Sequence, residues 1–249
     1  MRHAEEVTPE TVRPVRRADL VQRWTDLTFL HWPADPAAVA PLLPAGTTPD
    51  LLDGVTYVGL IAFRMEGFGF LGGPGVPYFG TFCETNVRLY SVDAEGRRAV
   101  VFRSLEAERL IPVLTARVAL NLPYMWARMR LERDHDVITY TSRRRWPGPR
   151  GASSSLSARI GPPITEPTPL EHFLTARWGL HTRAWGRTRH LANEHPRWPL
   201  HRATLLSLDD DLVTAAGLPA PAGPPASVLY SPGVGVKFGR YHRHLAAQP

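Results

Sequence analysis

The 249-residue sequence has little lysine and cysteine: Lys237 is its only lysine and Cys83 its only cysteine. One cysteine excludes an internal disulfide framework and any zinc site built from several cysteines. No apolar run approaches the roughly 20 residues that a membrane-spanning helix needs. The first ten residues, MRHAEEVTPE, carry acidic side chains early and lack the apolar segment of a secretory signal. We therefore expect a soluble cytoplasmic protein.

The basic charge balance is a poor guide to a partner. The net charge is +6 and the isoelectric point is about 10.0, which would suit an anionic surface. However, 28 of the 29 basic residues are arginine, and together with abundant alanine and proline this is typical of a GC-rich genome. The densest run, Arg143–Arg145, is too short for a basic tail. We expect neither a nucleic-acid partner nor a membrane partner.

Short apolar segments separated by frequent proline predict many short elements in one β-rich domain. Residues 1–20 are polar without helical periodicity and predict a flexible arm, which leaves residues 21–245 as a single domain. The strands are predicted at Trp24–Trp32, Val55–Phe63, Thr81–Tyr90, Arg98–Leu105, Met125–Leu131, Val137–Arg144, Trp178–His181, Arg187–Ala192, Pro199–Leu206, Ser227–Tyr230 and Gly235–Tyr241. The helices are predicted at Ala37–Leu43, Glu106–Leu120 and from Thr168 to about Ala176, with a short one after Asp211. This pattern indicates a barrel or sandwich with helices packed on it.

Several short motifs point to chemistry that their context does not support. Gly67–Gly72 matches the letters of a dinucleotide fingerprint, but the following Gly-Pro-rich residues cannot open the helix that would meet a pyrophosphate. The sequence has no HEXXH metal motif and no G-x-S-x-G nucleophile elbow. Cys83 follows Phe82 in an apolar strand and is interpreted as a small buried side chain rather than a reactive thiol. We expect no metal and no cofactor.

The segment from Phe82 to Tyr90, FCETNVRLY, carries the most chemistry. Alternation along a strand places Glu84, Asn86, Arg88 and Tyr90 on one face and mostly apolar residues on the other. On a solvated surface this polar row would have no special meaning. Inside a barrel, the same row would need mutual hydrogen bonds, and a carboxyl group there could exchange protons with a ligand unless Arg88 pairs with it.

The order of several short motifs resembles one known family. They are Trp24…Phe29-Leu-His-Trp32, Leu43-Pro44, Asp53-Gly54, the Phe82–Tyr90 segment, Ala116-Arg117, Leu122-Pro-Tyr124…Ala127-Arg-Met129, Tyr140-Thr-Ser-Arg143, the Leu170–Trp178 segment and Trp198-Pro-Leu200. Over residues 22–241 they are similar to the domain of unknown function 2071 family, grouped with acetoacetate decarboxylase-like proteins. The resemblance implies a cone-shaped, mostly antiparallel β-barrel with flanking short helices and a ligand-sized cavity.

The resemblance also implies a difference in chemistry. Decarboxylases of this superfamily form a Schiff base on a lysine that follows a glycine-x-proline stretch. Here Tyr124 and Met125 follow Pro123 where lysines would be expected, and a phenol cannot form an iminium. Glu84 corresponds to the superfamily's cavity glutamate, and Arg117 to the arginine ahead of the lysine stretch. Schiff-base decarboxylation is therefore not expected.

We expect a small-molecule site for a carbonyl or carboxylate compound, with lyase- or hydratase-like acid–base chemistry if the protein is an enzyme. Glu84 would be the general acid or base and Tyr124 the hydrogen-bond donor to a carbonyl group. Arg88 or Arg117 would hold an anion, and Arg143 and Asn86 are further ligand-binding candidates. Two other classes stay open: a non-catalytic ligand-binding or sensor protein, and a structural or interaction domain without an active site. A homo-oligomer is possible in each of these classes.

Overall fold

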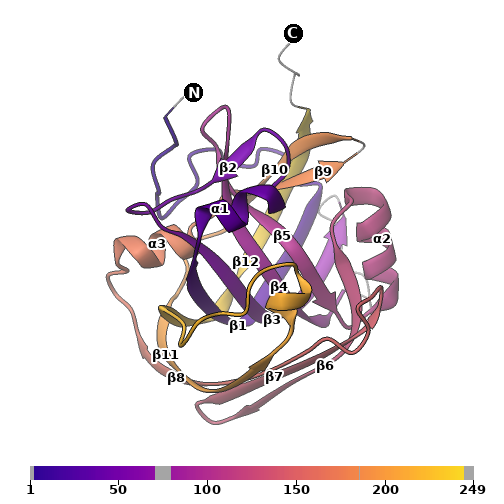
Figure 1. Ribbon diagram of the computed structural model, residues 1–249, viewed down its shortest axis with the longest axis vertical. Coiled ribbons are helices and arrows are strands. Elements are labelled where there is room, and N and C mark those ends of the chain that lie inside the picture. The colour runs from indigo at the N-terminus through magenta and orange to yellow at the C-terminus, as the bar shows by residue number, and fades with distance from the viewer. Residues whose placement is uncertain (1–2, 71–79, 185, 244–249) are drawn as a thin grey trace.

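A computed structural model describes residues 3–70, 80–184 and 186–243 of the chain (Figure 1). Strands dominate it: β1 (Leu20–Ala34), β2 (Thr47–Pro49), β3 (Thr56–Phe70), β4 (Phe82–Asp93), β5 (Arg98–Ala107), β6 (Tyr124–Asp134), β7 (Val137–Trp146), β8 (Ser153–Pro163), β9 (Gly179–Ala184), β10 (Arg187–Glu194), β11 (His201–Asp210) and β12 (Ser227–Arg243). The helices are short: α1 (Pro36–Val39), the 3₁₀ helix η1 (Ala40–Leu42), α2 (Leu110–Leu120), α3 (Pro169–Thr175) and α4 (Leu212–Ala215). The expected β-rich α+β class is confirmed.

Strand pairing closes the sheet on itself in two ways. One ring of pairs runs β5-β6-β7-β8-β11-β12-β1-β3-β4 and returns to β5. A smaller ring runs β5-β9-β10-β12-β1-β3-β4, closed by the β10–β12 pairing and by a single β5–β9 bridge. We call these the large ring and the small ring, and β12-β1-β3-β4-β5 the shared sheet. All pairings are antiparallel except β5–β6 and β5–β9.

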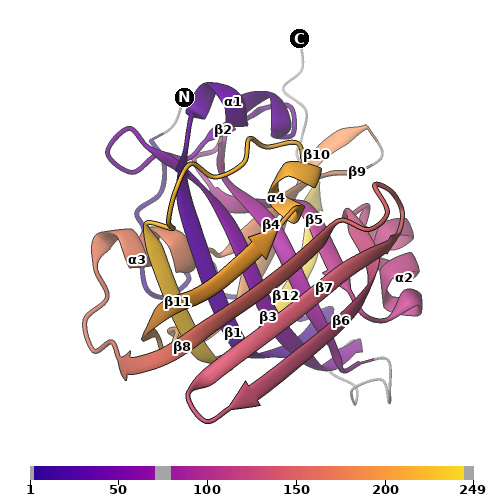
Figure 2. The same cartoon turned by 60° about the horizontal axis from the view of Figure 1, so that its bottom comes forward.

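Because the shared sheet belongs to both rings, both of its faces are buried. One apolar cluster, which includes Leu60, Leu89 and Ile138, fills the large ring. Two further clusters lie on the opposite face and are completed by α3 and by residues near Trp198. Figure 2 shows β6, β7, β8 and β11 wrapping around one side of the shared sheet, with α3 at one end and α2 at the other. A polar residue on β4 therefore lies inside the protein whichever way it points.

Local sequence signals explain where two helices begin. Asp35 caps α1 by accepting a hydrogen bond from the backbone N–H of Ala37, and Pro36 occupies the first helical position. Thr168 and Glu171 form the expected capping box at the start of α3. Both helix starts are confirmed.

The helix predicted at Glu106–Leu120 begins later, because β5 continues to Ala107 and pairs with both β4 and β6. The predicted strand Val55–Phe63 is longer, since β3 pairs with β1 as far as Phe70. The predicted strands at Ser227–Tyr230 and Gly235–Tyr241 are parts of one strand, β12, and β8 was not predicted. Most of the loop predicted over residues 67–77 lies outside the described residues.

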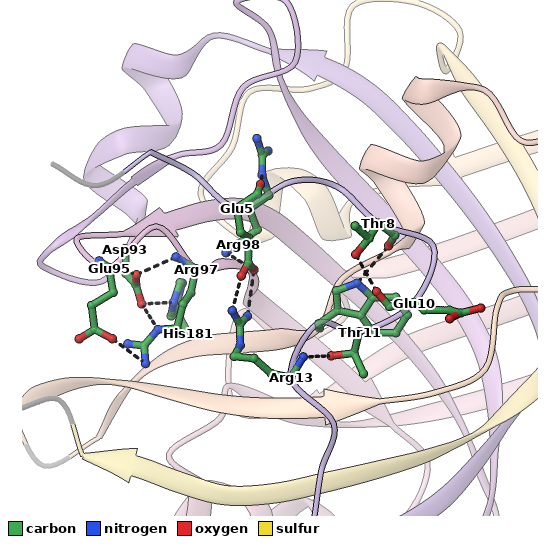
Figure 3. A network of polar contacts seen from close by, with 11 residues as sticks. Glu5, Thr8, Glu10, Thr11, Arg13, Asp93, Glu95, Arg97, Arg98 and His181 are labelled. Carbon is green, nitrogen blue, oxygen red and sulfur yellow. Dashed lines mark hydrogen bonds and ion pairs between the residues drawn. The ribbon is translucent and has the colours of Figure 1, made fainter.

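The arm has no regular secondary structure over residues 3–19, yet polar contacts fasten it to the barrel (Figure 3). Glu5 pairs with Arg13 and accepts hydrogen bonds from Arg98 of β5. Farther along, the carbonyl of Thr8 accepts a hydrogen bond from the indole of Trp178 at 3.1 Å. The arm thus lies against the end of the small ring formed by β5, β9 and β10.

None of the described helices has the length and apolarity that crossing a bilayer requires.

Candidate functional site

The polar row on β4 lies inside the protein. Glu84, Asn86, Arg88 and Tyr90 point to the small-ring face of the shared sheet, and each is at most 9% exposed. Phe63 of β3 and Ala107 of β5 flank Glu84 in register. The sequence left open whether this polar row lies on a solvated surface or inside a barrel. Because β4 belongs to both rings, the row lies inside.

Tyr124 reaches Glu84 because α2 carries the chain from the end of β5 to β6, which runs parallel to β5. Leu105 and Tyr124 are partners in that parallel pairing, one strand away from Glu84. The Tyr124 hydroxyl donates to Oε2 of Glu84 at 3.0 Å. Tyr124 as a residue is partly exposed, whereas Glu84 is buried. The two residues predicted to carry the chemistry are thus in direct contact.

Burial raises the pKa of Glu84 to about 8, and the negative charge of Glu106 on the other face adds to the rise. Hydrogen bonds from the side chains of Tyr124 and Asn86 lower this pKa but do not offset burial. In the described part of the chain, no arginine or histidine forms an ion pair with Glu84. At neutral pH the carboxyl group is therefore mostly protonated and can donate a proton.

Tyr124 remains a neutral phenol. Burial and the adjacent Glu84 together raise its pKa well above the ordinary value for tyrosine. Its backbone is fixed by Arg117, which donates to the Tyr124 carbonyl oxygen at 2.6 Å. The Tyr124 proton is engaged with Glu84, so the pair offers a carbonyl group one free neutral donor, the protonated Glu84 carboxyl group.

Arg88 lies four residues beyond Glu84 on the same face. Its guanidinium donates to the hydroxyl of Tyr90 at 3.1 Å and to the carbonyl of Leu174 at 2.8 Å, and it lies 5.7 Å from the ring centre of Phe29. Within the described ranges, no carboxylate is paired with it. A buried guanidinium without an anion is costly, and an anionic ligand would reduce that cost.

The surroundings of Arg88 carry excess positive charge. Arg98 and Arg177 share a single buried carboxylate, that of Asp50. Nε2 of His31 lies 2.7 Å from the Tyr90 hydroxyl and shares a hydrogen bond with it. Burial holds the pKa of His31 well below its usual range, and the positive charges of Arg88 and Arg177 lower it further. His31 is therefore neutral, and this end of the site is suited to an anion.

Aromatic side chains line the region between the two ends. Trp24 stacks on Trp198 with ring centres 6.1 Å apart and contacts Phe63 at 5.7 Å, while Trp198 meets Phe29 edge-on at 5.4 Å. Among the residues that the structure describes, the buried polar atoms near the site without a hydrogen-bond partner include Nε1 of Trp24, a donor, and Oδ1 of Asn86, an acceptor. Unsatisfied groups of this kind are uncommon inside proteins and mark places where a ligand can bond.

Two of the predicted ligand-binding arginines lie elsewhere. Arg143 is exposed on β7, because the alternation that buries Ser142 and Arg144 turns it outward, away from Glu84 and Tyr124. The guanidinium of Arg117 bonds to the Tyr124 backbone and lies 5.2 Å from the ring centre of Trp146, so it supports Tyr124. Lys237 is exposed on β12, between the buried Val236 and Phe238.

Sequence reasoning missed the ion pair that occupies the large-ring face of the same sheet. Arg144 of β7 binds Glu106 of β5 with both side chains essentially fully buried, and Ser104 donates to the second carboxylate oxygen of Glu106. The signal was present, since Ile138 and Tyr140 are apolar at even positions of β7 and predict that Arg144 points inward.

A chain of hydrogen bonds near the arm has the composition of a Ser-His-Asp triad. Ser91 Oγ contacts His181 Nδ1 at 2.8 Å, and His181 Nε2 contacts Asp93 at 3.1 Å. All three residues are buried, and Ser91 is wholly inaccessible. We interpret the chain as a structural network at the end of the small ring. The residues described contain no cluster of three or more metal-ligand side chains.

The double-ring β fold is that of acetoacetate decarboxylase-like proteins. Acetoacetate decarboxylase from Legionella pneumophila superposes with a TM-score of 0.62 and 14% identity, covering 96% of this chain and 94% of that one. An acetoacetate decarboxylase-like enzyme from Sphingomonas wittichii gives 0.61 and 14%, covering 91% and 92%. The enduracididine biosynthesis enzyme MppR, solved in complex with pyruvate, gives 0.61 and 15%, covering 93% and 91%. At these identities the likeness shows the fold alone.

Sequence comparison identifies the family. The model of the DUF2071 family, described as an uncharacterized conserved protein, matches residues 21–235, and this chain belongs to that family. The uncharacterized protein YqjF of Bacillus subtilis is 28% identical over 204 residues, which are 82% of this chain and 84% of the relative. The resemblance seen in the sequence is thereby confirmed.

Proposed function

We propose that the small-ring face of β4 is a small-molecule site for a compound that carries a carbonyl group and a carboxylate. The observation that carries the proposal is the contact between the buried Glu84 and the Tyr124 hydroxyl, and no cation in the described ranges pairs with the Glu84 carboxyl group. The unpaired Arg88 at the other end of the row supports it. Pyruvate, which MppR binds, is a compound of this class.

The ligand's carboxylate would face Arg88 and its carbonyl oxygen would face Glu84 and Tyr124. A protonated Glu84 can transfer a proton to the carbonyl oxygen or to an adjacent carbanionic carbon, and the resulting carboxylate can then accept one. The hydrogen bond from Tyr124 would stabilise the carboxylate that forms on Glu84 when it gives up its proton. The chemistry is therefore enolisation, hydration, dehydration or an aldol-type step.

A covalent route through an amine is not part of the proposal. The family resemblance implies that Tyr124 takes the place of the decarboxylase lysine, and the only lysine of the chain, Lys237, is exposed on β12. Borohydride added in the presence of pyruvate should therefore leave the protein mass unchanged. An adduct on Lys237 located by peptide mass spectrometry would contradict the non-covalent mechanism.

The test of the site compares ligand-induced stabilisation in three proteins. Thermal unfolding is followed with pyruvate and with a panel of small 2-oxo and hydroxy acids. Glu84→Gln and Tyr124→Phe should each lose most of the stabilisation seen with the unaltered protein. Tyr140→Phe is the matched control, because Tyr140 is also buried and hydrogen-bonded, to Thr28 at 3.1 Å, but lies on the large-ring face.

The same panel separates catalysis from binding. Product detected by NMR that disappears in Glu84→Gln identifies an enzyme. Stabilisation without product identifies a binding or sensor protein, the second candidate, which a tyrosine in the expected place of the decarboxylase lysine would favour. If both substitutions at the site leave ligand binding unchanged, the site assignment is wrong.

A further inference from the structure

Helix α2 turns apolar side chains toward solvent. Val118 is 79% exposed and Ile111 is 54% exposed, and Leu110 and Leu114 are exposed as well. At 3.6 residues per turn, these four positions fall within an arc of about 100° on the helix. A helix packed on a globular protein normally buries such a stripe. Here Val113 is buried instead, and the stripe faces outward.

The exposed stripe continues onto the ends of β6 and β7. Arg117 of α2 lies over the ring of Trp146, which is itself 40% exposed. Trp146 is the register partner of Trp126 on β6, and Arg145 lies 4.8 Å from the Trp126 ring centre. Figure 2 shows α2 beside this end of β6 and β7. The helix stripe and the two tryptophans therefore form one surface, which we call the α2 surface.

Unpaired arginines border the α2 surface. Arg128 and Arg143 are cross-strand partners, and both are exposed. Like charges directly opposite one another are unfavourable in a sheet. In the part of the chain that the structure describes, no carboxylate is paired with Arg128, Arg143 or Arg145. By contrast, Arg130 on the same strand has an acidic partner, Glu132, at 3.0 Å.

An apolar helix stripe, tryptophans at its edge and a border of unpaired arginines match the surface of anionic phospholipids. Aliphatic side chains enter the acyl boundary, tryptophan prefers the headgroup level, and each arginine near the surface attracts anionic lipid. We infer that the α2 surface docks this protein on a membrane that contains anionic phospholipids. This is peripheral attachment, which needs no membrane-spanning helix, and it departs from the expectation, drawn from the sequence, of no membrane partner.

Two other occupants fit the α2 surface less well. Single-stranded nucleic acid binds by stacking its bases on free aromatic faces, but guanidinium groups already lie over Trp126 and Trp146. A second copy docked about a two-fold axis would bring two arginine clusters together. The charge arrangement therefore favours a lipid surface over either alternative.

The test is co-sedimentation of the full chain with large vesicles, one set of phosphatidylcholine with 30% phosphatidylserine and one of phosphatidylcholine alone. The protein should bind the first set and not the second. Arg128→Gln with Arg143→Gln should lower the partition coefficient about 25-fold, roughly five-fold for each arginine. Ile111→Ser with Val118→Ser should lower it about ten-fold or more.

Matched controls come from the same barrel. Arg159 on β8 and Leu206 on β11 are also exposed, and Arg159→Gln and Leu206→Ser should leave vesicle binding unchanged. Equal losses in test and control variants would show attraction by net charge alone and overturn the inference. So would failure to bind anionic vesicles, tighter binding to single-stranded oligonucleotides than to vesicles, or a dimer in solution that Ile111→Ser with Val118→Ser dissociates.

Discussion

The shared sheet places a buried glutamate on each of its faces, and the two are treated differently. On the large-ring face, Glu106 is held by Arg144 and Ser104, so each of its oxygens has a partner. On the small-ring face, the hydrogen bonds that Glu84 receives within the described ranges come from the neutral side chains of Tyr124 and Asn86, and burial raises its pKa to about 8. Burial raises the pKa of Glu106 as well, but Arg144 and Ser104 oppose that rise, whereas only neutral side chains oppose it at Glu84. We therefore propose Glu84, and not Glu106, as the carboxyl group available for proton transfer.

Two buried arginines, Arg144 and Arg88, differ in the same way as the two glutamates. The guanidinium of Arg144 is neutralised by Glu106, while Arg88 bonds only to Tyr90 and to a backbone carbonyl among the residues described. Separating an acid and a base on one face, instead of pairing them, costs stability. Proteins accept this cost where function needs the groups free.

The largest effect on stability is expected from replacing Arg144, the arginine that pairs with Glu106. Arg144→Met leaves Glu106 buried without a cation and should lower the free energy of unfolding by about 3–5 kcal/mol. Urea unfolding followed by circular dichroism measures this loss. Arg143→Met is the control, because the neighbouring arginine is exposed and its replacement should change stability by less than about 0.5 kcal/mol. Similar losses for the two variants would contradict the assignment of Arg144 to the interior.

The unpaired carboxyl group should make stability depend on pH. The folded pKa of Glu84 is raised from 4.5 to about 8, so the folded state binds more protons than the unfolded state between these values. Stability contributed by this group is present below pH 4.5 and is lost as pH rises through 8, roughly 3 kcal/mol between pH 5 and pH 8.

Glu84→Gln mimics the protonated acid and should remove this dependence. The variant should therefore be more stable than the unaltered protein at pH 9 and close to it at pH 5. Urea unfolding at both pH values of the two proteins gives the difference directly. A difference that does not change with pH would show that Glu84 titrates near its ordinary value.

The smallest effect on stability is expected from removing the unpaired arginine. Arg88→Met deletes hydrogen bonds but also removes an uncompensated buried charge, so the free energy of unfolding should change by about 1 kcal/mol or less. The pKa of His31 should rise, since Arg88 is one of the charges that lower it. Urea unfolding and the imidazole NMR shift of His31 measure these outcomes. A loss as large as that of Arg144→Met would mean that Arg88 is a structural residue.

Local sequence patterns predicted much of the fold. The alternation in Phe82–Tyr90 predicted which side chains of β4 share a face, and the Thr168–Glu171 capping box predicted the start of α3. Boundaries were less accurate where pairing across the sheet extended a strand, as in β3 and at the end of β5. The outward direction of Arg143 was not predicted, because its neighbours on β7 were not used to decide which arginine points inward.

The sequence by itself determined that the chain is β-rich, that one face of β4 is polar, and that no amine follows Pro123, because these depend on residue order and local alternation. Only the tertiary structure decided that β4 is buried on both faces, that Tyr124 meets Glu84, and that Arg144 rather than Arg88 neutralises a glutamate. Those facts depend on ring closure and on the crossover through α2, which join residues 38 or more positions apart. Side-chain pairing at such distances is set by strand register, and no short segment of sequence carries that information.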